Sequence, residues 1–188
     1  RIARETGFTG VQFHSAHGYL LSEFLSPDIN TRSDAWGGSL ENRARIHLEI
    51  IKRCRAEVGA DFPISVKLNS ADFQKGGFTA NESIQVAKML EDASVDIIEI
   101  SGGSYEQPKQ IGADDLSINP DRSEERKEST IAREAYFLEY ANNIRKAVSL
   151  PLMVTGGFRT RDGIERALQS NICQMVGVGR PLCADPYC

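Results

Sequence analysis

The sequence lacks the features that mark several large classes of protein. Its four cysteines are widely spaced and form no Cys-x-x-Cys pair, so neither a zinc site nor a disulfide framework is indicated. No apolar run approaches the roughly 20 residues needed to span a bilayer, and a formal net charge of −4 provides no basic surface for nucleic acid. We therefore expect a cytoplasmic protein with reduced thiols and with neither a membrane nor a nucleic acid as a partner.

The size and composition of the chain are those of one soluble domain. Its 188 residues allow a sizeable core, and 40% hydrophobic with 26% charged residues is an ordinary balance. The chain begins at Arg1 in a segment typical of the last turns of a helix, with Gly7 as the cap, and stops at Cys188. We expect residues 1–188 to form a single domain that is truncated at both ends.

Strand-like and helix-like segments alternate along the chain. The sequence predicts strands over residues 10–14, 64–69, 96–101, 152–155 and 174–178. It predicts helices over 40–58, with Ser39 and Gly59 as caps, over 79–93, opened by a Thr79–Glu82 capping box, over 131–148, and after Thr160. Long polar loops are expected over 18–38 and 102–130. This alternation indicates right-handed βαβ units and a parallel sheet.

Two folds share that alternation, an open doubly wound sheet and part of a (β/α)8 barrel. A sheet covered by helices on both sides is apolar on both faces. The strand at 64–69 instead has one polar face, made of Ser65, Lys67 and Asn69. Such a face suits the mouth of a barrel that holds a ligand, and we predict an α/β fold that is a partial TIM barrel. Glu99 also faces inward in this register, and no role is assigned to it.

Titratable side chains follow the first strand directly. His14, His17 and Tyr19 lie within six residues of one another. On a helical turn, histidines at i and i+3 face one pocket, where two imidazole N–H groups can hold a carbonyl or phenolate oxygen while the phenol delivers a proton nearby. A metal site would need a third ligand, for which Glu23 and Asp28 are the neighbours in sequence, and we expect no metal.

Two glycine-rich loops follow the last two strands. They contain Gly156 and Gly157 in one loop, and Gly179 with Arg180 in the other. Glycine allows the backbone to approach a phosphate closely, and the helix opened by Thr160 favours an anion at its N-terminus. Paired loops at this position match the usual phosphate site of barrel enzymes.

The His-x-x-His-Gly-Tyr segment, the Phe24-Leu25-Ser26-Pro27 segment and the Gly37-to-Arg43 segment together resemble the old yellow enzyme family of FMN-dependent ene-reductases. The resemblance covers essentially the whole chain and implies that its five strands are the fourth to eighth of a barrel, with the first three missing upstream. It implies that a set of residues in the loop after the first strand serves as a structural brace with an ion-pair network: Arg32, Asp34, Gly37, Gly38, Glu41, Asn42 and Arg43.

The resemblance also implies the residues and the reaction of the site. His14 and His17 would bind the substrate oxygen, and Tyr19 would donate a proton to the α-carbon. Lys67 would lie beside the flavin ring. Gly156, Gly157, Gly179 and Arg180 would bind FMN, the last three of these at its phosphate. NADPH or NADH would reduce FMN, which would then reduce the activated C=C bond of an enone-type substrate.

Three alternatives stay open at this point. One is a dienoyl-CoA reductase-like relative with an iron–sulfur cluster, another is a non-catalytic fragment that cannot hold FMN alone, and the third is a phosphate-binding barrel enzyme without flavin. The third has no use for the His-x-x-His-Gly-Tyr segment. The choice between NADH and NADPH, the physiological substrate and the formation of a homo-oligomer are also left open.

Overall fold

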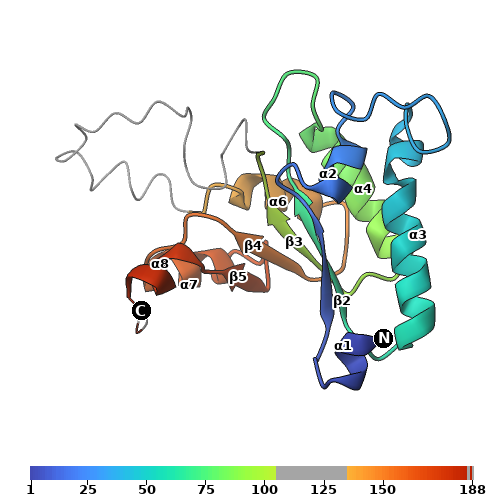
Figure 1. Ribbon diagram of the computed structural model, residues 1–188. Helices are drawn as coiled ribbons and strands as arrows, with labels where there is room; N and C mark the ends of the chain where they lie inside the picture. Colours follow the sequence, from blue (N-terminus) through green and yellow to red (C-terminus); the bar gives the residue numbers. More distant parts are fainter. Residues whose placement is uncertain (105–134, 186, 188) are drawn as a thin grey trace.

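The computed structural model describes residues 1–104, 135–185 and 187, and it contains a five-stranded parallel sheet (Figure 1). The strands are β1 (Val11–Ser15), β2 (Ile64–Asn69), β3 (Ile97–Ser101), β4 (Leu152–Thr155) and β5 (Met175–Gly177). They lie within one or two residues of their predicted bounds. All four neighbouring pairs are parallel, as the alternation of strands and helices predicted.

The order of the strands decides between the two candidate folds. The spatial order is β1-β2-β3-β4-β5, identical to the order in sequence. A doubly wound sheet reverses its order at a switch point, whereas successive right-handed crossovers in one direction place every helix on the same face. The prediction of a partial barrel is therefore confirmed for the described residues.

Helices α3 (Leu40–Val58), α4 (Ala80–Asp92) and α6 (Leu138–Arg145) lie along the outer face of the sheet, where α3 contacts α4 and α4 contacts α6 (Figure 1). The other described helices are α1 (Ile2–Glu5), α2 (Leu20–Leu25), α7 (Arg161–Gln169) and α8 (Arg180–Ala184). Among the described residues, no helix combines the length and the apolar character needed to cross a membrane.

The core lies between the outer face of the sheet and these helices. Val66, Leu68, Ile98, Ile100 and Val154 alternate along their strands and are fully buried. Each such side chain contributes roughly 1.5–3 kcal/mol through the burial of apolar surface. Because successive side chains of a strand point to opposite faces, this core directs the polar residues of the same strands to the inner face.

Caps fix the ends of the helices where the sequence placed them. The Ser39 hydroxyl accepts a hydrogen bond from the Asn42 amide at the start of α3, and Gly59 ends this helix with a φ of 78°. Thr79 and Glu82 form the predicted capping box of α4. These side chains satisfy backbone groups that have no partner inside the helix, so the predictions for α3 and α4 are confirmed.

Three helices differ from the prediction. The helix predicted over 131–148 begins at Leu138, because residues 135–137 form a turn in which Ala135 has a φ of 58°. Residues 131–134 and most of the predicted 102–130 loop lie outside the described residues. The predicted loop over 18–38 contains α2, and α8 follows Gly179 directly. With six and five residues, both are too short for a helical period to be recognised.

The expected brace after β1 is present in part. Arg32 pairs with Asp34, and the buried Arg43 donates to the carbonyl oxygens of Gly38 and Leu25. The carboxylate partner of Arg43 is Glu82 on α4. Arg43 therefore joins the segment after α2 to α4, and the described residues contain two separate ion pairs here where one network was expected.

Candidate active site

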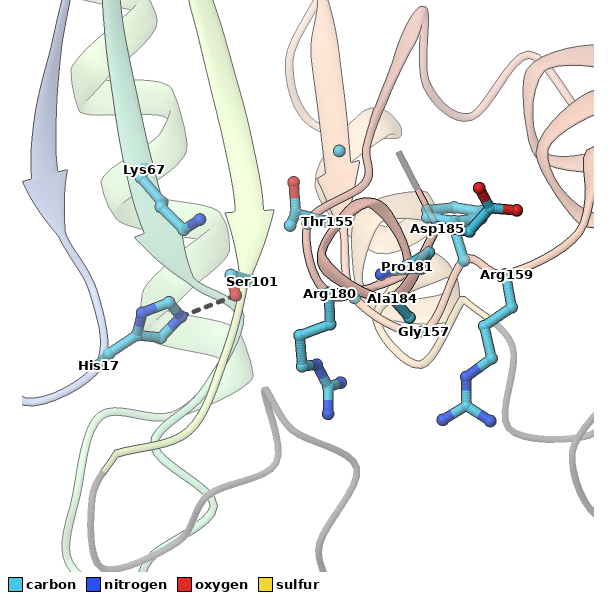
Figure 2. Close-up of a pocket in the computed structure, with 14 residues that line it drawn as sticks. His17, Lys67, Ser101, Thr155, Gly157, Arg159, Arg180, Pro181, Ala184 and Asp185 are labelled. Atoms are coloured by element: carbon cyan, nitrogen blue, oxygen red, sulfur yellow. Dashed lines mark hydrogen bonds between the residues drawn. The ribbon is translucent and has the colours of Figure 1, made fainter. Parts of the chain in front are cut away.

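A cavity of about 560 Å³ opens at the carboxyl ends of β2 to β5 (Figure 2). Ser101, Thr155 and Gly177, which end β3, β4 and β5, line it. This is the end of the barrel at which active sites are built. The cavity also brings together every residue predicted to bind the cofactor and one of the predicted histidines: Lys67, Gly156, Gly157, Gly179, Arg180 and His17.

The two glycine loops form the far side of the cavity. Gly156 and Gly157 have φ values of 139° and 85°, which residues with a side chain rarely adopt. A Cβ on Gly156 would lie 2.8 Å from the ring of Phe137, so backbone and aromatic ring touch there. A Cβ on Gly179 would meet no atom within 4 Å, which leaves the backbone of Gly179 open to a bound group.

Cationic and hydrogen-bonding groups flank these loops. Arg159, in the loop between β4 and α7, and Arg180, at the start of α8, both line the cavity (Figure 2). Thr160 caps α7 by accepting a hydrogen bond from the Gly163 amide at 3.1 Å. Guanidinium groups beside glycine-rich backbone form a donor set suited to a phosphate. The arrangement fits the phosphate end of a mononucleotide.

His14, His17 and Tyr19 form a cluster on the opposite side. The ring centroid of His14 lies 5.3 Å from that of His17 and 5.0 Å from that of Tyr19. His17 lines the cavity, and Tyr19 is 46% exposed. The structure therefore brings the three predicted side chains together, with only His17 of the three among the residues that line the cavity.

The backbone that holds His17 differs from the expected helical turn. His14 belongs to strand β1, and His17 has a left-handed conformation with a φ of 65°. The His17 amide donates to Asn69 Oδ1 at 3.2 Å, and its ring Nε2 forms a 2.7 Å hydrogen bond with Ser101 Oγ. The expectation of an i, i+3 helical pair was wrong, because a left-handed turn held by side chains at the ends of β2 and β3 brings the two rings together edge to face.

Both imidazoles of the cluster are neutral at neutral pH. Burial lowers the pKa of His17 to about 4, and the positive charge of Lys67 adds to this effect. Burial and Lys67 also lower the pKa of His14. A neutral imidazole carries one N–H donor and one acceptor nitrogen, so the cluster can donate hydrogen bonds without carrying a positive charge of its own.

Lys67 is part of a polar network on the inner face of the sheet. Its ammonium donates to Glu99 Oε1 at 2.7 Å, and Gln12 Nε2 donates to Glu99 Oε2 at 2.8 Å. Lys67 and Glu99 are register partners on β2 and β3. The anionic partner that a lysine at this position requires is therefore Glu99, for which sequence reasoning gave no role.

Several residues of the cavity were not predicted from sequence. Ser101 and Thr155 have a signal in hindsight, since each is the last polar residue of a strand and points to the inner face. Phe158, Arg159 and Pro181 belong to the two predicted phosphate loops but were given no role of their own, and Ala184 and Asp185 reach the cavity from α8 and its end, for which local patterns gave no signal. Within the described ranges, no group of three or more His, Cys, Asp or Glu side chains is arranged to hold a metal ion.

Comparison with solved structures agrees with this fold and extends it. The chain superposes on 2-naphthoyl-CoA reductase, solved with 2-naphthoyl-CoA, with a TM-score of 0.84 and 36% identity, over 98% of this chain and 26% of that one. It also superposes on an old yellow enzyme homologue from Zymomonas mobilis with a TM-score of 0.72 and 26% identity, over 98% of this chain and 46% of that one.

Sequence comparison gives the same answer. The chain is 40% identical to an NADH-dependent flavin oxidoreductase of Talaromyces variabilis, over 99% of this chain and 44% of that protein. The chain spans less than half the length of three curated relatives that are 39–40% identical to it. The family model of the NADH:flavin oxidoreductase / NADH oxidase family matches residues 1–188. The resemblance to old yellow enzymes is thus confirmed, and the chain belongs to the NADH:flavin oxidoreductase / NADH oxidase family.

Proposed function

We propose that this chain forms the catalytic part of an FMN-dependent oxidoreductase that uses NADH or NADPH to reduce the activated C=C bond of α,β-unsaturated carbonyl compounds. One observation carries the proposal. A single cavity has glycines and arginines suited to a phosphate at one side, Lys67 and His17 at the other, and the rest of the histidine–tyrosine cluster beside it.

The cavity suits a flavin mononucleotide in size and chemistry. Its volume of about 560 Å³ lies in the ordinary range for ligand pockets. Gly157, Gly179 and Arg180 would hold the phosphate, and Lys67 would face the ring system. FMN, when bound, supplies the two-electron chemistry that links a nicotinamide to an alkene, while the protein supplies orientation and electrostatics.

His14 and His17 would hold the carbonyl oxygen of the substrate. Because both imidazoles are neutral, each has one N–H to donate, and such hydrogen bonds strengthen as negative charge develops on the oxygen. Withdrawing electron density in this way makes the β-carbon electrophilic. The fixed backbone of His17 keeps this donor in place before the substrate arrives.

Tyr19 would supply the proton. Its phenol lies beside His14 and is 46% exposed, so it can reach a substrate held by the histidines and can be reprotonated from solvent. Transfer of this proton to the α-carbon completes the reduction that begins with hydride addition at the β-carbon.

A second candidate substrate class is an aromatic or unsaturated CoA thioester. The likeness to 2-naphthoyl-CoA reductase, at 36% identity, favours it. A thioester carbonyl would be held by the same two histidines, so the described cluster suits both classes. Turnover of 2-cyclohexenone compared with that of an enoyl-CoA distinguishes them.

The experiment that tests the proposal begins with flavin retention. The chain is mixed with FMN, unbound flavin is removed by filtration, and the visible spectrum is recorded. We expect a retained, shifted flavin spectrum that bleaches when NADH or NADPH is added without oxygen. A soluble, folded chain that retains no flavin would show that this polypeptide is a non-catalytic fragment or a barrel without flavin.

Tyr19→Phe then tests the assignment of the proton donor. We expect slower formation of the saturated product from 2-cyclohexenone, with unchanged bleaching by the nicotinamide. The matched control is Tyr187→Phe, which removes a phenol that is 95% exposed. Equal product formation by the Tyr19 variant and the control would rule Tyr19 out as the proton donor.

A further inference from the structure

Glu99 is a buried carboxylate on the inner face of the sheet. It is 5% exposed, and both of its oxygens accept hydrogen bonds from side chains on β1 and β2. Gln12, which donates to one oxygen, also donates to Ser65 Oγ at 2.9 Å. These bonds fix the orientation of the carboxylate on three strands, as expected of a buried charge that must be paired and hydrogen-bonded.

The lysine of the pair lies between this carboxylate and the cavity. The side chain of Lys67 is 19% exposed and that of Glu99 is 7% exposed. Of the two, Lys67 is among the described residues that line the cavity. A group bound in the cavity therefore meets the ammonium directly and the carboxylate through it.

The two charges act in opposite directions on the neighbouring histidines. Burial is the largest cause of the lowered pKa of His14 and His17; Lys67 lowers both pKa values further, and Glu99 raises them. Burial raises the pKa of Glu99 itself, but the hydrogen bond and positive charge of Lys67, with the hydrogen bond from Gln12, outweigh it, and the pKa is lowered. The carboxylate is thus ionised at neutral pH and offsets the lysine at every group nearby.

We propose that Glu99 is a positioning residue that acts through Lys67, holding its ammonium at the cavity wall and offsetting its charge. The inference rests on the proposed flavin function where it concerns the flavin. A wall with both charges is close to neutral, whereas a wall with Lys67 alone carries one positive charge. Since a reduced flavin is anionic, the pair sets how strongly this wall favours reduction, and Glu99 makes it weaker than an unpaired lysine would.

The first test needs no flavin. Glu99→Gln keeps the size of the side chain and removes its charge, Glu99→Asp keeps the charge, and Glu165→Gln removes a carboxylate from a pair on the surface of α7. The pKa of His14 is measured by NMR in the unliganded chain. We expect Glu99→Gln to lower it by about half a unit, the effect of one screened charge nearby. Glu99→Asp, which keeps the charge but shortens the side chain, should change it less, and Glu165→Gln should not change it. An unchanged pKa in Glu99→Gln would overturn the proposal.

The second test measures the reduction potential of bound FMN. Glu99→Gln should favour the reduced flavin tenfold or more, which is about 30 mV for a two-electron couple, while Glu165→Gln matches the unaltered chain and Glu99→Asp lies between the two. If the unaltered chain holds no flavin, the proposed function fails and the His14 titration alone decides whether Glu99 offsets Lys67. If flavin binds and its potential is unchanged or lower in Glu99→Gln, the proposed function stands and this inference fails.

Discussion

His17 shows how much of this site depends on one residue with an unusual backbone. A left-handed conformation costs a residue with a side chain roughly 1–3 kcal/mol, and His17 adopts it with a φ of 65°. Asn69 holds the backbone amide and Ser101 holds the ring. The cost is offset at the ends of two neighbouring strands, and the ring gains a fixed direction toward the cavity.

Replacing Ser101 should therefore affect the use of substrate more than the binding of flavin. Ser101→Ala removes the hydrogen-bond partner of His17 Nε2. We expect about tenfold slower reduction of 2-cyclohexenone, the size of one lost orienting hydrogen bond of about 1.4 kcal/mol, with FMN affinity close to unchanged. The matched control is Ser149→Ala, which removes an exposed hydroxyl in the loop that precedes β4. Equal rates in both variants would contradict the role given to Ser101.

Among the elements, α3 and α4 are joined by one side chain with two functions. Glu82 closes the capping box of α4 and also pairs with Arg43 of α3, whose side chain is 5% exposed. A buried guanidinium needs a counter-charge because the interior solvates it poorly. Glu82 therefore couples the start of α4 to the packing of α2 and α3.

Glu82→Gln should cost more stability than the loss of the cap alone. We expect about 2–3 kcal/mol from leaving Arg43 without a counter-ion, against about 1 kcal/mol for Thr79→Ala, which removes only the N-cap hydroxyl. Urea unfolding of both variants measures the difference. Similar losses in the two variants would mean that the ion pair contributes little.

The loops after β4 and β5 allow binding to be separated from folding. Gly179→Ala places a methyl group in open space at the cavity, whereas Gly156→Ala forces a methyl group against Phe137 at a φ of 139°. We expect Gly179→Ala to weaken FMN binding about tenfold, equal to about 1.4 kcal/mol, with an unchanged melting temperature, and Gly156→Ala to lower the melting temperature. Titration of FMN and thermal unfolding check both, and a lower melting temperature for Gly179→Ala would contradict an open cradle.

At the scale of the whole molecule, buried neutral histidines make stability depend on pH. His47 is 2% exposed, and burial lowers its pKa to about 4, as for His17. An unfolded histidine takes up a proton below about pH 6.5. In the folded chain, His47 takes up this proton only below about pH 4. The unfolded state therefore binds more protons in this window, and stability falls as the pH falls through it.

His47→Leu should flatten this dependence. Between about pH 6.5 and 5, the difference in pKa corresponds to roughly 2 kcal/mol for His47. Urea unfolding at pH 7 and at pH 5 gives the fall in the free energy of unfolding for each protein. We expect this fall to be smaller in the variant by about that amount. Comparing each protein with itself removes any effect of the substitution on absolute stability, and equal pH dependence would exclude His47 as the source.

Helix bounds and cavity-lining residues could be predicted from the sequence where they depend on residues close together in the chain. Ser39, Gly59 and the Thr79–Glu82 box act within one helical turn, so the bounds of α3 and α4 could be predicted. The partner of Lys67 could not, because it depends on the register between β2 and β3. The turn at His17 was missed for the same reason, since side chains from two other strands hold it.

The consecutive order of the strands has a consequence for how the molecule is made. Because each strand lies next to the one that precedes it in sequence, every new strand emerging from the ribosome meets an edge that is already present. The sheet can therefore lengthen in one direction as synthesis proceeds, one βα unit at a time, without waiting for a distant segment. The described lining of the cavity runs from His17 to Asp185 in sequence, so Gly179 and Arg180 can join it only after the loop that follows β5 has been synthesised.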